Sequence, residues 1–272
     1  MSEVPLRLGG VPEHVNLPWH LAREGAALAE TPTIWTDQPG GTGQMLEALA
    51  GSTLDLVSIL TEGTVAAIAG GLPVTILQVY VASPLQWGVF APAGAGLSAE
   101  ADLEGRPVAI SRRRSGSHLM AFVQAQRNGW ELDDSQFVIT GGLDGAREAF
   151  ADGRASTFLW DQYMTRPLVR GGEFVQLGVE ETPWPSFVIA VRNEVLAART
   201  SEVGAVIDAV VAEAQQLHGR AGVVDEIAQR FQLGTDTVEA WLASTTFAAR
   251  TAWDPSVGAE VLATLAAAGF TD

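Results

Sequence analysis

The eight residues 111–118, Ser-Arg-Arg-Arg-Ser-Gly-Ser-His, combine several kinds of hydrogen-bond donor in one short segment. They stand between a strand-like run at 106–110 and a helix-like run that begins at Leu119. Small residues leave backbone N–H groups accessible, serine hydroxyls add donors, and a helix dipole adds partial positive charge, so this segment can bind a negatively charged or polar ligand group. The alternative is an ordinary Ser-capped helix preceded by a solvated arginine run.

The basic residues at 112–114 stand out because the rest of the chain is acidic. The sequence holds 16 Lys+Arg against 32 Asp+Glu, which gives a formal net charge of −16. An acidic surface repels nucleic acid and anionic lipid headgroups, so neither is expected as a partner. A local basic cluster suits capture of a small anion. It can equally be a solvated loop, and the acidic surface can equally reflect a saline habitat.

Length and composition set further bounds. At 272 residues and 47% hydrophobic, the chain can bury a large core and suits two lobes better than one. No stretch approaches about 20 uninterrupted apolar residues, and the first residues lack a signal-peptide pattern. We expect no membrane insertion and a cytoplasmic location as written, or an extracytoplasmic one if a leader has been removed. The absence of cysteine excludes disulfides, thiolate metal sites and cysteine nucleophiles.

Strand-like and helix-like segments alternate along the chain. The first set has strands at 4–8, 33–36, 54–59 and 74–81 with helices at 17–29, 44–50 and 64–69. A second set after Pro84 has strands at 87–91, 107–110, 136–140 and 157–160 with helices at 119–128, 145–152 and 162–169, followed by a strand at 187–191. This βαβ rhythm predicts parallel, doubly wound sheets. After residue 192 the pattern is wholly helical.

Several short motifs occur in a recognisable order. They are Gly-Val-Pro-Glu-His at 10–14, Trp-His at 19–20, Pro-Gly-Gly-Thr-Gly at 39–43, Leu-Thr-Glu-Gly at 60–63, Trp-Gly at 87–88, Ser-Gly-Ser-His at 115–118, Trp-Asp at 160–161 and Thr-Pro-Trp-Pro at 182–185. In order and spacing, the chain resembles the type II periplasmic-binding-protein family. The resemblance is narrower to the nitrate, sulfonate and thiamine-precursor substrate-binding branch of ABC transporters, which includes leaderless members of uncertain ligand.

The resemblance implies an α/β fold with two lobes that close on a small ligand. Lobe 1 would be discontinuous, with residues 1–83 plus 185–272 and the C-terminal helices, and lobe 2 would be inserted at 84–184. The hinge would lie near 82–88 and 182–187, where the chain carries prolines.

The loops that follow the strands are the expected ligand-binding surface, because ligands of open α/β sheets bind beyond the carboxyl ends of the strands. Four tryptophans lie beside these loops, namely Trp19, Trp87, Trp160 and Trp184. Any one of them can instead pack in the core, and we expect two of the four to contact ligand. Trp241 and Trp253 are assigned to packing. The candidate ligand-binding residues are His14, Trp19, Gly41, Thr42, Gly43, Thr61, Glu62, Trp87, Ser111, Ser115, Gly116, Ser117, His118, Trp160, Asp161 and Trp184.

No catalytic, metal-binding or cofactor-binding residue is assigned. His14 and His118 can act as acid, base or metal ligand, but the sequence holds no HExxH motif. The Gly-rich turn at 40–43 lacks the Gly-Lys-Ser/Thr ending of a P-loop. Ser115 and Ser117 adjoin His118, yet adjacency in sequence does not create nucleophile–base geometry, and no Gly-x-Ser-x-Gly elbow is present.

Three function classes follow. The first is a solute-binding protein that closes on a small organic anion, a sulfonate, a carboxylate or a pyrimidine-like compound, with an ABC permease as a possible partner. The alternative is a cytosolic enzyme of the same fold that uses Glu62, Asp161 or His14 in acid/base chemistry on a small carboxylated metabolite. A partner-binding regulatory module is a third class. If the first is right, replacing Ser115 and Ser117 by Ala should weaken binding and leave most stability intact.

Overall fold

The computed structural model describes residues 4–270, which divide into two compact units. Of these residues, unit 1 comprises 4–83 and Trp184–Leu262, and unit 2 comprises Pro84–Pro183 and 263–270. The outermost ends of the expected lobe 1, at 1–3 and 271–272, lie outside the described residues. The prediction from the sequence assigned residue 184 to lobe 2 and residues 185–272 to lobe 1. In the structure Trp184 groups with unit 1, and the chain from Ala263 onward groups with unit 2.

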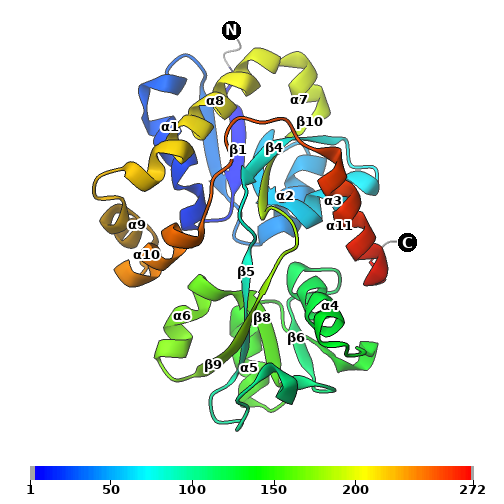
Figure 1. The fold of residues 1–272 in the computed structure, drawn as a ribbon. Helices are drawn as coiled ribbons and strands as arrows, with labels where there is room; N and C mark the ends of the chain where they lie inside the picture. Colours follow the sequence, from blue (N-terminus) through cyan, green and yellow to red (C-terminus); the bar gives the residue numbers. More distant parts are fainter. Residues whose placement is uncertain (1–3, 271–272) are drawn as a thin grey trace. The chain divides into compact units, whose positions relative to one another are not determined.

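Unit 1 contains a five-stranded sheet with the order β2-β1-β3-β10-β4 (Figure 1). Its strands are β1 (Leu6–Gly10), β2 (Thr33–Asp37), β3 (Leu56–Leu60), β4 (Val74–Val81) and β10 (Phe187–Arg192). β1 pairs in parallel with β2 and β3, whereas β10 runs antiparallel to β3 and β4. The inner strands β3 and β10 are buried at every position except Leu60, and all their residues but Ser58 and Arg192 are apolar, because both faces of the sheet are covered.

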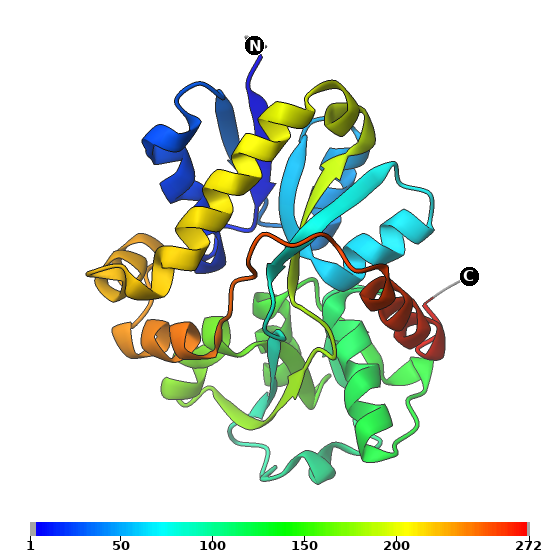
Figure 2. The same ribbon diagram turned by 45° about the horizontal axis from the view of Figure 1, so that its top comes forward.

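Unit 1 has helices between its strands and a helical segment after β10. They are α1 (Leu17–Glu24), α2 (Gly41–Ala50), α3 (Thr61–Ala69), α7 (Asn193–Ala198), α8 (Thr200–Gln216), α9 (Val223–Phe231), α10 (Thr235–Ser244) and the first part of α11 (Pro255–Ala267), with 3₁₀ turns at His14–Asn16, Ala26–Leu28 and Leu217–Gly219. The long helix α8 lies along α1 (Figure 2). Its buried positions recur every three or four residues, which is the spacing of one helix face.

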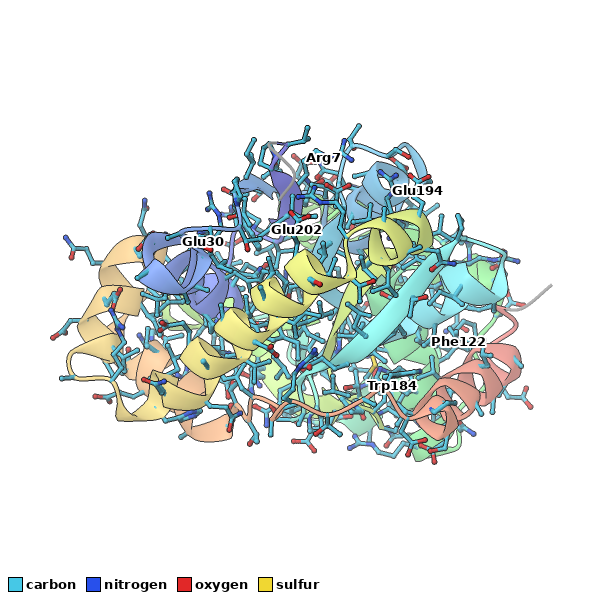
Figure 3. The ribbon with its side chains drawn as sticks, turned by 90° about the horizontal axis from the view of Figure 1, so that it is seen from above. Arg7, Glu30, Phe122, Trp184, Glu194 and Glu202 are labelled. Atoms are coloured by element: carbon cyan, nitrogen blue, oxygen red, sulfur yellow. The ribbon has the colours of Figure 1, made fainter. Side chains whose placement is uncertain are left out.

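Ion pairs connect β1 with the residue before β3 and with the end of β10. Arg7 and Asp55 form a salt bridge of 2.5 Å, Arg192 also contacts Asp55, and Arg192 pairs with Glu194. Figure 3 labels Arg7, Glu194 and Glu202, which lie at this side of unit 1. These charges therefore have structural partners within unit 1.

Unit 2 contains the second five-stranded sheet, with the order β7-β6-β8-β5-β9. Its strands are β5 (Gln86–Pro92), β6 (Val108–Ile110), β7 (Phe137–Ile139), β8 (Thr157–Asp161) and β9 (Phe174–Glu181), and its helices are α4 (Gly116–Asn128), α5 (Leu143–Ala151) and α6 (Gln162–Arg170), with 3₁₀ turns at Glu100–Leu103 and Asp134–Gln136. β6 is parallel to β7 and β8, and β5 is antiparallel to β8 and β9.

The core of unit 2 lies on both faces of its sheet, because neighbouring strand residues point in opposite directions. Val89 and Ile110 belong to one buried cluster together with Met120 of α4. Phe90 and Ala109, the adjacent positions on the same two strands, belong to a second cluster with residues of α5.

Two features of the sheets differ from the sequence-based prediction. The βαβ rhythm predicts parallel strands, but β5 and β10 run antiparallel to their neighbours. The chain reaches each of these two strands from a strand of the other sheet, so no crossover helix within one sheet imposes a parallel direction. β9 was not predicted. It is an edge strand with Gly178 in its middle, and six of its eight residues are exposed or half-buried, so it lacks the apolar run of a central strand.

The two chain segments that connect the units are hydrogen-bonded to each other on each side of the division. In unit 1, the Ser186 hydroxyl donates to the Ser83 carbonyl oxygen at 2.8 Å. In unit 2, the Leu85 N–H donates to Thr182 Oγ1 at 3.0 Å, and the Thr182 N–H donates to the Leu85 carbonyl.

Candidate functional site

The segment 111–118 lies between a strand and a helix of unit 2, as predicted, but the helix begins three residues earlier than predicted and the serine hydroxyls already have partners. β6 ends at Ile110 and α4 begins at Gly116. Ser115 is the N-cap, and its Oγ accepts from the His118 N–H at 3.3 Å. Ser117 Oγ accepts from the Ser111 N–H at 2.9 Å and lies 3.0 Å from Ser115 Oγ. Replacing Ser115 and Ser117 by Ala would therefore remove hydrogen bonds within the loop and the cap of α4 as well as any ligand contact.

The arginines of this loop face solvent or neighbouring groups of unit 2. Arg113 forms a salt bridge with Asp134, and its guanidinium lies 5.3 Å from the centre of the Phe137 ring. Arg114 has φ +60°, an uncommon conformation for a residue with a side chain. Arg112 is exposed.

His118 is held as a neutral ring by aromatic packing. Its Nδ1 accepts from the Arg114 N–H at 3.0 Å, which leaves the proton on Nε2. The ring packs against Phe137 at 4.3 Å, Phe270 at 4.7 Å and Phe122 at 5.2 Å between centroids. Burial and the nearby charge of Arg113 lower its pKa to about 4. This packing also explains why the end of the chain groups with unit 2.

Trp87, Trp160 and Asp161 are brought together at neighbouring ends of β5 and β8. Trp87 pairs with Asp161 across the two strands, and the two indole rings meet edge to face at 6.4 Å. Trp160 also stacks on Phe158 at 5.0 Å. The Asp161 carboxylate accepts from the Tyr163 and Met164 N–H groups at 2.9 Å each, so it caps α6, and burial raises its pKa to about 6.

In unit 1, Thr61 and Glu62 open α3 directly after β3. Glu62 is 6% exposed, and its Oε2 accepts from Trp184 Nε1 at 3.1 Å. Burial raises the pKa of this carboxyl group. Thr61 donates through Oγ1 to the Pro185 carbonyl at 2.5 Å. Trp184, labelled in Figure 3, is itself buried, so its hydrogen bond with Glu62 is shielded from solvent.

The glycine-rich segment 41–43 forms the first turn of α2, which begins three residues earlier than predicted. Gly41 has φ +66°, a conformation that favours glycine. A Cβ at Gly63 would lie 2.4 Å from Thr42 Cγ2, so the starts of α2 and α3 are close neighbours. The Gly41 N–H donates to the Gln38 carbonyl and the Thr61 N–H donates to the Ser186 carbonyl. The other N–H groups of the two first turns have no partner inside their helix, so they are the candidate donors for a ligand.

His14 and Trp19 lie in an aromatic core of unit 1. Trp19 is fully buried and packs against Trp35 and Tyr80 at 5.8 and 6.0 Å. His14 is 4% exposed and packs edge to face on Trp241 at 4.3 Å. Within residues 4–270 neither ring nitrogen of His14 has a hydrogen-bond partner, and burial lowers its pKa to about 4. Trp19 is thus covered by unit 1 itself, and Trp241 packs as expected.

Sequence reasoning missed a polar cluster on β5 and α6. Gln162 and Tyr163 both donate to the side-chain oxygen of Gln86, and Gln86 donates to Glu181 at 3.1 Å. Glutamine carries no motif, but Gln162 directly follows a strand, so the rule that selected Asp161 would have selected it too.

The described part of the chain holds no group of three or more His, Cys, Asp or Glu side chains arranged to bind a metal ion. Among residues 4–270, no helix is both long and apolar enough to span a bilayer.

Solved structures share this fold over nearly the whole chain, and the fold is that of the periplasmic binding proteins. The CA3427 gene product of Candida albicans, described as defining a family with the generic periplasmic-binding-protein fold, aligns with a TM-score of 0.90 at 25% identity over 98% of this chain and 90% of that protein. The alkanesulfonate-binding protein SsuA of Xanthomonas axonopodis pv. citri, bound to MOPS, aligns with a TM-score of 0.84 at 21% identity over 100% and 96%. The aliphatic sulphonate-binding protein SsuA of Escherichia coli gives 0.76 at 19% over 98% and 87%.

A family comparison agrees with the structural one. Residues 91–179 match the family described as Ca3427-like PBP. No curated protein sequence matches the chain significantly. The resemblance to type II periplasmic binding proteins and the two-lobed α/β fold class are therefore confirmed.

Proposed function

We propose that this protein is a solute-binding protein for a small organic anion, with a sulfonate as the first class to test. The observation that carries the proposal is the fold match to a sulfonate-binding protein over 100% of this chain and 96% of the other. Carboxylates and pyrimidine-like anions are the other classes in the proposal, and an ABC permease is the proposed partner.

Each unit, taken by itself, offers donors for an anion at its helix starts. In unit 1 they are the first-turn N–H groups of α2 and α3 other than those of Gly41 and Thr61, with the Glu62–Trp184 pair at the start of α3. In unit 2 they are the first N–H groups of α4, which follow the Ser115 cap. Each such terminus carries about half a positive elementary charge, which stabilises an anion.

Binding without turnover is favoured by how the carboxyl groups are used. An acid/base catalyst must exchange a proton with a substrate. Asp161 is engaged as the cap of α6, and Glu62 accepts from Trp184. We therefore place the enzyme alternative second, and it predicts consumption of the bound compound.

The experiment is a calorimetric titration with MOPS, methanesulfonate, nitrate, acetate and a pyrimidine carboxylate, with chloride at equal ionic strength as the control. The variant is Gly116→Pro, which removes one N–H from the first position of α4, where proline is well tolerated. The matched control is Thr235→Pro at the first position of α10. We expect one anion class to bind with at least about tenfold lower affinity in Gly116→Pro and equal affinity in Thr235→Pro. Equal affinity in both variants, or no binding of any anion, would contradict the proposal.

A further inference from the structure

Unit 2 holds a pocket that the proposed anion site does not use. It has a volume of about 580 Å³ and lies among β5, α4, α6 and β9. This volume is within the range of small-molecule sites. Val123, Val179 and Pro183 give it an apolar wall, and its charged lining residues are Arg127, Glu180 and Glu181.

The charge of the pocket is negative. Arg127 Nη2 lies 2.7 Å from Glu100 Oε2 and 2.6 Å from Glu180 Oε1, so one guanidinium is shared by two carboxyl groups. Glu181 adds a third carboxylate, whose Oε1 accepts from Gln86. With every group ionised, the pocket lining and the adjoining Glu100 carry three carboxylates against one guanidinium, so a cationic ligand is favoured over an anionic one.

The Glu180 carboxyl group has one oxygen that lacks a hydrogen-bond donor among the described residues. Its side chain lines the pocket but is only 2% exposed. Its Oε1 has no hydrogen-bond partner among the described residues, although Arg127 Nη2 lies at ion-pair distance and the Glu100 carboxyl group is a side-chain neighbour. Burial, and then the neighbouring Glu100, raise its pKa to about 7 against the opposing effect of Arg127. A buried carboxyl oxygen without a donor is unfavourable, so a donor supplied by a ligand would stabilise this arrangement.

We propose that this pocket binds a small alkylammonium compound, whose ammonium N–H groups donate to Glu180 and Glu181 while its alkyl part packs on Val123 and Val179. An ammonium group supplies three donors and one positive charge, which matches both the free acceptor and the excess negative charge. A metal ion is a poorer occupant, since the residues that the structure describes offer no cluster of three metal-ligating side chains.

The test is calorimetric titration of the whole protein with n-butylammonium chloride at pH 8, where the Glu180 carboxyl is mostly ionised. 1-Butanol and sodium butyrate are the neutral and anionic probes of the same size. We expect butylammonium to bind at least about tenfold more tightly than either. Glu180→Gln should lower that affinity about tenfold and Glu181→Gln about threefold. Glu148→Gln, an equal charge change at an exposed position of α5, should leave it unaltered.

Three results would overturn the proposal: no binding of butylammonium, equal binding of 1-butanol, or unaltered affinity in a folded Glu180→Gln protein. If thermal unfolding shows that Glu180→Gln does not fold, unaltered affinity in Glu181→Gln overturns it instead. The proposal does not depend on the anion site. Butylammonium should not compete with any anion found in the separate panel, so the two ideas fail independently.

Discussion

His14 should make the stability of this protein depend on pH in a way that one substitution removes. The ring is 4% exposed, has no hydrogen-bond partner within residues 4–270, and has a pKa lowered from 6.5 to about 4 by burial. Above pH 6.5 the ring is neutral in both the folded and the unfolded chain, so it has no effect. Between pH 6.5 and 4 the unfolded chain binds a proton that the folded chain does not, so the free energy of unfolding falls.

The magnitude follows from the two pKa values. At pH 5 the unfolded form is almost fully protonated at His14 and the folded form is about one-tenth protonated, which gives a loss of about 2 kcal/mol relative to pH 7. In His14→Leu this loss should be absent. The carboxyl groups contribute equally to both proteins, so the difference between the two isolates His14.

The assay is urea unfolding at pH 7, 6 and 5, followed by the fluorescence of the tryptophans near His14. An NMR titration of the His14 ring proton in the folded protein gives its pKa directly. Equal losses of stability in wild type and His14→Leu, or a folded-state pKa near 6.5, would refute the reasoning.

Three further predictions concern capping and packing. Ser115→Ala should lower the free energy of unfolding by about 1 kcal/mol, because the His118 N–H loses its acceptor, and a midpoint unchanged in scanning calorimetry would contradict this. Asp161→Ala should cost a similar amount while Asp161→Asn, which keeps the cap acceptor, should cost much less; equal urea midpoints for the two variants would show that the cap contributes little. Gly63→Ala places a Cβ 2.4 Å from Thr42 Cγ2 and should destabilise by about 1–3 kcal/mol, and Gly63→Ala combined with Thr42→Ser should recover part of that loss if the clash is the cause.

Local patterns were enough to find most elements. The strand predicted at 74–81 has those bounds in the structure, and the helix predicted at 162–169 ends one residue later. Both are strong periodic runs next to a clear boundary. β9 was missed because an edge strand needs no continuous apolar run, and the antiparallel direction of β10 depends on which neighbour it pairs with rather than on its own residues.

The sequence by itself determined the fold class and the strand-end loops where polar side chains gather, because hydrophobic periodicity and loop residues act over a few positions of the chain. Only the tertiary structure decided which of those side chains already have partners. Ser115 and Asp161 cap the helices that follow them, and Glu62 meets Trp184 across 122 positions of sequence. The carboxyl groups of Glu100 and Glu180, which share Arg127, carry no motif at all. Burial and long-range contact set hydrogen-bonding and charge states, and neither is encoded in the spacing of neighbouring residues.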